Sequence, residues 1–541
     1  MKKLATMALA SITLLVLLAT GALATVTSTQ SGSWSSTATW GGSPIPTAAD
    51  GVLIPTNLTV TVDVPTAACL NIQLGSSTPG AGSGTLVFSA SSRLTVSGLV
   101  TVGASNNKGS INMTGGGTLT CEGLVSQGVG TWTPGTGTVE FTASNTLPNN
   151  SITSFNNLTI AGGTTTLNAN TLVSGDLNIA PAATLDESLR VLTLTGNWIN
   201  HGTFTGNTGT VIFNRNGNQT VSGSGANNFN QIRLNMGLLG SNTLEVVATN
   251  FTAPDPFLTL SNGTFKASGS FPVVNSFVLG PIYNIPPTAG LWINNPNVTV
   301  TPQAGNVSVR GVLHLSAGTF NVGTIADNNL DYVGGSSFIL DGGALNVAGH
   351  FGRNNATAST SYNQSAGTVT VVTQGSTDPV FAGFDLGAAA STFTMSGGTI
   401  VIQGATSAPA DYLVNASVSG VTGGTVQAGN AATPNAQTLR IQSPVPIGSL
   451  LVSNATAQAT KPVAQLVTSS LNVVGGVTIQ AGAALNANGL NLSVGGDWLN
   501  SGTFTAGPTT TFNGSAAQGL THAGGEIFNG LTVNRPPRRS R

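Results

Sequence analysis

Apolar and polar residues alternate in short units through the middle of the chain, and a pair of small residues that includes Gly precedes each alternation. The units read LSAGTFNV from residue 315, LDGGALNV from 340, QSAGTVTV from 364, MSGGTIVI from 395 and VTGGTVQA from 421. Alternation with a period of two predicts a short β-strand with one buried face. The Gly before it supplies a tight turn, because Gly tolerates positive φ.

The units return at a nearly constant step. Equivalent positions are Thr319, Ala344, Thr368, Thr399 and Thr425, at steps of 25, 24, 31 and 26 residues. Such a step is typical of stacked repeats, in which each unit buries its apolar face against its neighbours. We therefore predict an all-β fold, a right-handed parallel β-helix of roughly twenty coils after a cleaved signal peptide. One inward ladder should consist of Phe320, Leu345, Val369, Ile400 and Val426.

Two other all-β arrangements also fit short alternating strands. Tandem β-sandwiches would repeat at about 100 residues rather than about 25. An outer-membrane barrel would need aromatic girdles, and aromatic residues make up 6% of this chain.

A longer segment is duplicated. GNWINHGTFTG at 196–206 returns as GDWLNSGTFTA at 496–506, and after one deletion FNQIRL at 229–234 matches FNGLTV at 528–533. The match defines a cassette of about sixty residues. In an alternating strand its Trp198 and Trp498 are predicted to pack inside the coil, with a sugar-stacking platform as the alternative. Phe204 and Phe504 should be buried at equivalent heights.

Reactive residues change between the two copies, whereas the Trp, Gly, Thr, Phe and aliphatic residues are kept. The exchanged pairs are Asn197 and Asp497, His201 and Ser501, Asp186 and Asn486, and Glu187 and Ala487. A reacting group would not tolerate such exchanges, so the cassette is interpreted as a structural unit.

The N-terminus has the pattern of an export signal: Lys2 and Lys3 precede an apolar run that ends in small residues. The predicted organisation is a signal peptide at 1–24, an N-terminal β-helix region with a capping coil at 25–165, a first cassette at 166–255, central coils at 256–440, a second cassette at 441–535, and a basic Pro-containing tail at 536–541. We predict a secreted or cell-surface protein with no integral membrane segment after signal cleavage.

Charge is scarce. Only 6% of residues are charged, against about a quarter in ordinary soluble proteins. Nucleic acid is an improbable partner on this basis, because phosphate binding needs clustered Lys and Arg. The one basic cluster lies at the end of the chain, at Arg535, Arg538, Arg539 and Arg541. Cys69 and Cys121 are compatible either with a disulfide or with two buried thiols.

Candidate catalytic residues are few. Glycoside hydrolysis commonly needs two carboxylates about 5 to 10 Å apart, and Asp186 and Glu187 form the one adjacent acidic pair. Neighbouring residues on a strand point to opposite faces, so this pair is interpreted as a polar turn. Asp327, Asp331 and Asp341 form the densest acidic stretch, without the spacing of a Ca²⁺ loop.

The histidines give no metal-binding pattern either. His201, His314, His350 and His522 are scattered, without the spacing of a zinc site. We predict no catalytic residue, no metal ligand and no cofactor.

The segment SGSWSSTATWGGSPIPTAADGVLIPTNLTVTVD at 31–63 resembles the opening coil of bacterial secreted β-helix proteins and the eight-glycine extracellular domain, with Asp50 and Gly51 in the reverse of that domain's order. The cassette resembles repeats of adhesin-like surface proteins. The resemblance implies a noncatalytic surface protein whose β-helix is a stalk or binding surface, with cell-surface glycans or other surface proteins as partners. The alternatives are a carbohydrate-active β-helix enzyme, either a lyase or a hydrolase, and a glycan-binding module.

Overall fold

The computed structural model describes residues 25–534, except 77–81, 105–107, 129, 150, 238–239, 281–282 and 453–461. The predicted signal peptide at 1–24 and the basic tail at 536–541 lie outside the described residues. The protein is an all-β solenoid of about twenty turns built from parallel strands, which confirms the predicted fold class. Among the described residues the one helical segment is a short 3₁₀ turn, η1, at Thr37–Trp40.

Two compact units make up the chain, Met1–Gly137 and Thr138–Arg541. In the first unit, three parallel sheets form the sides of the coils. The first sheet contains β1 (Thr25–Thr27), β3 (Gly51–Ile54), β6 (Asn71–Leu74), β9 (Leu99–Val102) and β12 (Gly123–Ser126). The second contains β2 (Gly32–Ser33), β4 (Thr59–Val62), β7 (Ser83–Phe88), β10 (Lys108–Asn112) and β13 (Trp132–Thr133). The third contains β5 (Ala67–Cys69), β8 (Arg93–Val96) and β11 (Thr118–Cys121).

The two Trp residues of the N-terminal motif fill the first coil. Trp34 and Trp40 are fully buried, and their rings meet edge to face with centroids 5.2 Å apart. The indole Nε1 of Trp40 donates a hydrogen bond of 2.9 Å to the carbonyl oxygen of Trp34. These contacts explain why both positions carry a large aromatic side chain.

The spacing of the coils shows whether Cys69 and Cys121 can form a disulfide. Cys69 pairs in register with Val96, and Thr120 pairs with Thr95, so Cys121 follows at the same rung position as Val96. A whole strand therefore lies between the two cysteines. Strands are about 4.8 Å apart, so the sulfur atoms sit too far apart to bond, and no disulfide joins them. Of the two alternatives, the structure has two buried thiols.

The second unit also begins with three-sided coils. One sheet contains β14 (Thr138–Phe141), β17 (Asn157–Ile160), β20 (Leu177–Ile179), β23 (Trp198–Asn200), β26 (Gln219–Ser222) and β29 (Thr243–Val246). The next contains β15 (Asn145–Thr146), β18 (Thr164–Thr166), β21 (Thr184–Asp186), β24 (Thr203–Thr205), β27 (Ala226–Asn228) and β30 (Phe251–Thr252). The third contains β16 (Ser154–Phe155), β19 (Thr171–Val173), β22 (Val191–Leu194), β25 (Thr210–Phe213) and β28 (Gln231–Asn235).

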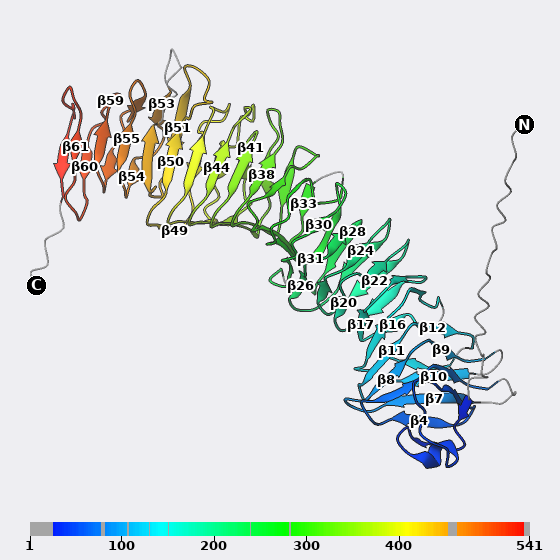
Figure 1. Cartoon of the computed structure of the whole chain (residues 1–541). Helices are drawn as coiled ribbons and strands as arrows, with labels where there is room; N and C mark the ends of the chain where they lie inside the picture. Colours follow the sequence, from blue (N-terminus) through cyan, green and yellow to red (C-terminus); the bar gives the residue numbers. More distant parts are fainter. Residues whose placement is uncertain are drawn as a thin grey trace, which may run out of the picture. The chain divides into compact units, whose positions relative to one another are not determined.

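The long strand β31 (Leu258–Ala267) links these coils to the later ones. It pairs first with β28 and then with β29 and β34. From here the sheet that we call the central sheet continues through β34 (Ala289–Ile293), β37 (Val312–Leu315), β40 (Ser336–Leu340), β43 (Thr360–Gln364), β46 (Thr392–Met395) and β49 (Val418–Val421). Figure 1 shows these strands side by side along the second unit.

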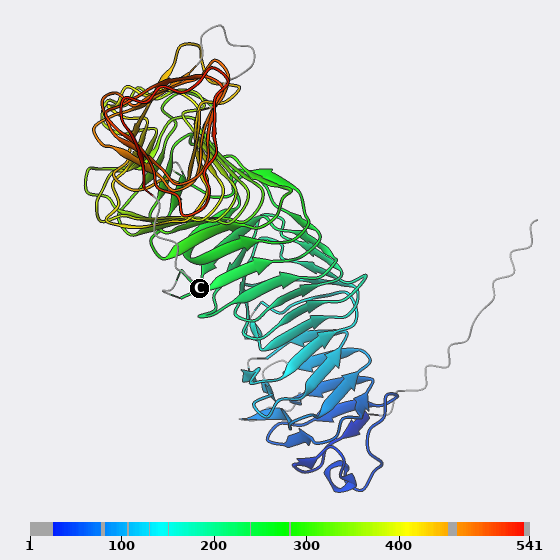
Figure 2. The same ribbon diagram turned by 90° about the vertical axis from the view of Figure 1, so that its left-hand side faces the viewer.

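Three further sheets complete the later coils, and Figure 2 views the last of these coils nearly end-on. The eleven-stranded sheet contains β32 (Val273–Asn275), β35 (Val298–Val300), β38 (Thr319–Val322), β41 (Ala344–Val347), β44 (Thr368–Val371), β47 (Thr399–Ile402), β50 (Thr425–Ala428), β52 (Ser449–Val452), β55 (Val477–Ile479), β58 (Trp498–Asn500) and β61 (Leu520–Thr521). The ten-stranded sheet contains β33 (Tyr283–Ile285), β36 (Val307–Val309), β39 (Leu330–Tyr332), β42 (Phe351–Arg353), β45 (Phe384–Leu386), β48 (Tyr412–Val414), β51 (Thr438–Gln442), β53 (Val463–Leu466), β56 (Ala484–Asn486) and β59 (Thr503–Thr505). The four-stranded sheet contains β54 (Leu471–Val473), β57 (Leu492–Val494), β60 (Thr510–Phe512) and β62 (Leu531–Val533).

The predicted inward ladder is confirmed. Strands β38, β41, β44, β47 and β50 pair in succession, and their registers place five buried side chains on consecutive rungs: Phe320, Leu345, Val369, Ile400 and Val426. Each residue follows the Gly-containing turn by the same number of positions. The local alternation therefore determined which face of these strands is buried.

Candidate functional site

The densest acidic stretch of the sequence does not form one site. Asp327 accepts hydrogen bonds from the backbone N–H (2.6 Å) and the hydroxyl (2.7 Å) of Thr377, and these bonds lower the pKa of its carboxyl. Asp331 pairs with His350, and Asp341 pairs with His314. The three carboxylates thus go to three different partners. In the part of the chain that the structure describes, no group of three or more His, Cys, Asp or Glu residues could hold a metal ion.

Charged residues do gather along the ten-stranded sheet, in an arrangement that the sequence did not predict. Three close contacts between a basic side chain and a carboxylate lie on neighbouring coils. They are His350 Nε2 with Asp331 Oδ1 at 3.0 Å, Arg353 Nε with Asp385 Oδ1 at 2.7 Å, and Arg440 Nη2 with Asp411 Oδ1 at 2.8 Å. We call these six residues the corner cluster. The partners are 19, 32 and 29 residues apart in sequence, so no local motif signals them.

Glycine makes room within the corner cluster. Gly352 lies between Asp331 and Asp385 in the cross-strand order of the ten-stranded sheet. A Cβ atom on Gly352 would lie 2.9 Å from Cδ2 of His350 and 3.4 Å from Cβ of Asp385. A side chain at position 352 would therefore crowd the His350 ring and the Asp385 side chain, and glycine avoids that conflict.

The buried carboxylates of the corner cluster are fully occupied by hydrogen bonds. Asp385, which is 0% exposed, binds Arg353 through both oxygens and also accepts the N–H groups of Ala382 and Gly387. These four hydrogen bonds occupy both oxygens, so neither is free to contact a substrate. The bonds of Asp385 instead fix the loop that leads into β45.

Asp411 has the same role one coil further on. It is 0% exposed and accepts the backbone N–H and hydroxyl of Thr406 as well as Nε and Nη2 of Arg440. Arg440 also donates to the carbonyl oxygen of Thr406 at 2.6 Å. The Asp411–Arg440 pair therefore fixes the loop before β48. The buried pairs of the corner cluster hold loops against the coil.

A second group of charged and aromatic side chains lies on the outer face of the central sheet. Successive rungs carry Glu245, Lys266, Trp292 and His314, and Asp341 follows the next strand. We call these five residues the outward row. Beyond the outward row, the equivalent positions on the following strands are Ile339, Asn363 and Thr394.

The members of the outward row touch one another in order. Lys266 Nζ lies 2.8 Å from Glu245 Oε1 and 3.9 Å from the centroid of the Trp292 ring. The Trp292 and His314 rings stack with centroids 4.1 Å apart and planes 14° apart. His314 Nε2 is 3.0 Å from Asp341 Oδ2. The indole thus has a cationic ammonium on one face and an imidazole on the other.

The two acidic ends of the outward row have lowered pKa values. Burial works against ionisation at Glu245, but hydrogen bonds from Lys266 and Ser268 and the Lys266 charge outweigh it. At Asp341 burial is likewise outweighed, by hydrogen bonds from Ser316 and His314. Both carboxylates are held in the ionised form.

The two Trp residues of the cassettes lie inside the coils, as predicted. Trp198 and Trp498 are 0% and 1% exposed, so neither offers a face to a sugar. Each stands at the centre of a cluster of aromatic rings. The first cluster consists of Trp198, Phe204, Phe213 and Phe229, and the second consists of Trp498, Phe504, Phe512 and Phe528.

Phe504 is less buried than predicted. Phe204 is fully buried, whereas Phe504 is half-buried. Strand β24 lies between β21 and β27, but β59 is the last described strand of its sheet. Phe504 therefore has a covering strand on one side only, and the alternation in its own strand cannot reveal that.

The interpretation of Asp186 and Glu187 needs a correction as well. Asp186 ends β21 and Glu187 begins the turn that follows, with Ser188 at φ 58° and its N–H bonded to Asp186 Oδ1 at 2.7 Å. The side chain of Glu187, however, points into the solenoid and is 0% exposed. A turn at the end of a strand can direct one polar side chain inward, and the sequence pattern gave no signal of it.

The remaining histidines stay apart from these groups. His201 Nδ1 lies 3.3 Å from the hydroxyl of Ser224, and His522 Nδ1 lies 2.8 Å from the carbonyl oxygen of Asn500. The two residues belong to different cassettes.

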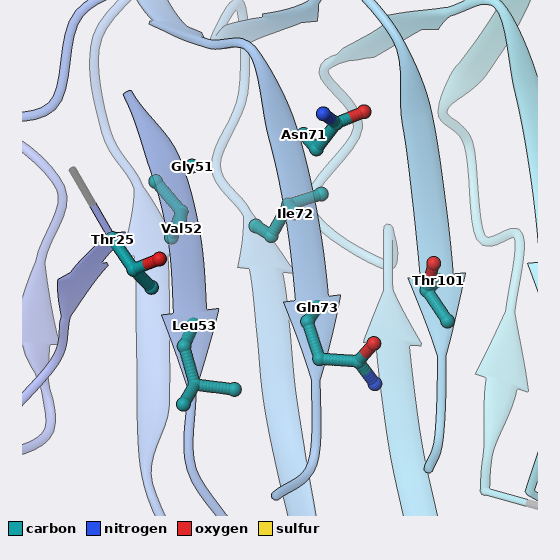
Figure 3. Close-up of a pocket in the computed structure, with 8 residues that line it drawn as sticks. All are labelled: Thr25, Gly51, Val52, Leu53, Asn71, Ile72, Gln73 and Thr101. Carbon is teal, nitrogen blue, oxygen red and sulfur yellow. The ribbon is translucent and has the colours of Figure 1, made fainter. Parts of the chain in front are cut away.

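The first unit carries a shallow depression of about 420 Å³ over the sheet that contains β1, β3, β6 and β9 (Figure 3). Its lining has no charged group and consists of Thr25, Gly51, Val52, Leu53, Asn71, Ile72, Gln73 and Thr101. Gln73 Nε2 already donates to the carbonyl oxygen of Gly103 at 2.6 Å. The depression therefore provides shape and a few hydrogen-bonding groups but no acid or base.

Comparison with protein-family models, with curated proteins and with solved structures finds no match to this chain. Within the described residues, no helix has the length and apolar character needed to cross a lipid bilayer. Function therefore has to be argued from the molecule itself.

Proposed function

We propose that this chain is a noncatalytic structural protein of the cell surface, adhesin-like in kind, whose solenoid serves as a stalk. The observation that carries the proposal is the internal duplication. The two cassettes keep the same ring cluster, while ionisable residues around it are exchanged, among them the exposed His201 for Ser501 and the buried Glu187 for Ala487. Repetition of a packing unit lengthens a solenoid without requiring a new interface.

The state of the carboxylates supports the same proposal. Asp385 and Asp411 are saturated by Arg and backbone donors, and Asp331 and Asp341 each face a His. Hydrolysis by the common route would need two carboxylates free to act as acid and base across a sugar. The corner cluster instead holds loops against the coil.

Two experiments test the proposal. First, protease added to intact producing cells should degrade the protein, because a surface stalk is accessible from outside; full protection would contradict a surface location. Second, a panel of acidic and neutral polysaccharides, with and without Ca²⁺, should show no turnover. Cleavage of any of them that disappears in Asp331→Asn would establish the enzyme alternative.

The outward row favours a second candidate function, noncatalytic glycan binding. Trp292 is half-buried on an outer face whose neighbouring positions are mostly small and polar. A saccharide could stack on the indole in place of the flexible Lys266 ammonium, while Glu245 and Asp341 accept hydrogen bonds from its hydroxyls.

A glycan array, followed by calorimetry with any oligosaccharide that binds, tests this candidate. Trp292→Ala should abolish binding, and Asn363→Ala should leave it unchanged because Asn363 lies on the same outer face beyond Ile339. Binding that survives Trp292→Ala would exclude the outward row as the site.

A further inference from the structure

The two cassettes build the same turn around Glu187 and Ala487. The N–H of Glu187 bonds to the carbonyl oxygen of Thr205 at 3.0 Å, and the N–H of Ala487 bonds to that of Thr505 at 2.9 Å. The next residues, Ser188 and Asn488, have φ values of 58° and 50°. The backbone is thus equivalent, and the interior side chain is a carboxyl in one copy and a methyl group in the other.

The carboxyl of Glu187 is enclosed. The residue is 0% exposed, and within the described residues neither carboxyl oxygen accepts a hydrogen bond of normal geometry, with the N–H of Leu192 as the nearby donor. The backbone of Gly209 packs so closely that a Cβ there would lie 2.5 Å from Cδ of Glu187. A buried ionised carboxylate without partners is very costly, whereas a protonated carboxyl is tolerated.

The loop that packs against this side chain is one residue longer in the first cassette than in the second. Between Thr205 and Thr210 the first cassette has four residues, whereas the second has three between Thr505 and Thr509. Gly209 belongs to this longer loop. The single deletion in the alignment thus coincides with the replacement of Glu by Ala, and Glu187 is a feature of the first cassette alone.

We propose that Glu187 makes the first cassette a pH-sensitive section of the solenoid, which opens locally as the pH rises, and that the second cassette lacks this device. The open form exposes the carboxyl to water and lets it ionise, whereas the closed form retains the proton. Alkaline conditions thereby favour the open form. The inference is independent of the stalk role.

The direction and the pH window follow from linkage. Burial raises the pKa of Glu187 from 4.5 to about 8; the Asp186 charge adds to the rise, and the nearby N–H of Leu192 opposes it. The stabilisation of the closed form is complete below pH 4.5 and is lost as the pH rises toward 8. Between these values the opening constant increases roughly tenfold per pH unit.

Other charged groups near Glu187 cannot account for such a response. Asp186 accepts hydrogen bonds from the N–H of Ser188 (2.7 Å) and from Nδ2 of Asn207 (2.6 Å), and the side chain of Arg190 is exposed. The strands packed around the turn, β18, β22, β24 and β25, carry no charged residue. Glu187 is thus the buried titratable group of this region.

Hydrogen–deuterium exchange of the full chain tests the proposal. Exchange of peptides covering 184–194 is measured from pH 5 to pH 9 in the native protein and in Glu187→Gln, which keeps the shape of the side chain without its titration. The ratio of native to Gln exchange rates should rise about tenfold per pH unit up to about pH 8 and then level off. Peptides covering 484–494 should exchange equally in both proteins.

Glu187→Ala provides the second variant, because Ala487 shows that the same turn accommodates Ala. Its opening constant should lose the pH dependence in the same way, even if the cavity that it leaves speeds exchange at every pH. A native-to-variant ratio that stays constant across the pH range would overturn the proposal, and so would a pH slope in both variants that exceeds the slope of intrinsic base-catalysed amide exchange.

Discussion

The indole Nε1 of Trp198 donates a hydrogen bond of 2.8 Å to Oδ1 of Asn227, which lies 29 residues away on the next coil. Asn200 Nδ2 donates to the same oxygen at 3.0 Å. In the second cassette Trp498 and Asn500 donate at 2.7 and 2.8 Å to Oε2 of Glu526. Both cassettes keep the Trp and Asn donors. The acceptor is an amide oxygen in the first cassette and a carboxylate oxygen in the second.

Trp198→Phe should destabilise the first cassette by about 1 to 2 kcal/mol, because it removes the Nε1–H donor and leaves a small cavity in place of the five-membered ring. Trp498→Phe should cost more, since its acceptor is a carboxyl group, and bonds to charged acceptors are stronger. Local opening measured by hydrogen exchange at 198–204 and 498–504 compares the two variants. Equal losses would mean that packing alone decides both positions.

Phe204→Ala should cost about 3 to 5 kcal/mol locally, since the residue is fully buried in a ring cluster. Phe504→Ala should cost clearly less, because the half-buried ring leaves a smaller cavity. Limited proteolysis followed by mass spectrometry should show new cleavage near residue 204 and a weaker effect near 504. The opposite order would contradict the difference in covering strands.

Arg353→Met should destabilise the loop that leads into β45 by about 3 to 5 kcal/mol, because it leaves Asp385 buried without its main partner. Adding Asp385→Asn should recover part of the loss, since the uncompensated charge is then absent. Protease sensitivity at 373–382 provides the measurement. A double variant no better than Arg353→Met would show that the ion pair contributes little beyond its shape.

Cys69 and Cys121 should be alkylated only after unfolding. Both are fully buried, and burial raises the pKa of the Cys69 thiol to about 12, which suppresses the reactive thiolate. Iodoacetamide should therefore leave the native protein unmodified and label both residues in guanidinium without reductant. A disulfide-linked peptide pair in the nonreduced digest would contradict the rung positions.

Much of the fold could be predicted because its signal is local. Alternation identifies the buried face of each short strand, and the constant step places Phe320 and Leu345 on neighbouring rungs. The same reasoning placed Trp198 and Trp498 inside their coils. It failed for Phe504, because burial also requires a strand on the next coil, and that information lies outside the residue's own strand.

By itself the sequence determined the all-β class, the parallel stacking, the inward ladder and the inward position of the two cassette Trp residues, since each depends on periods of 2 and about 25 that a chain carries along its length. Only the tertiary structure decided that Asp385 meets Arg353, that a strand separates Cys69 from Cys121, and that Glu187 turns inward. The Asp385–Arg353 pair and the inward side chain of Glu187 lie at or near the ends of strands, where the chain turns and loop length varies. Which partner a corner residue meets depends on how neighbouring coils are stacked, and no local pattern encodes that geometry.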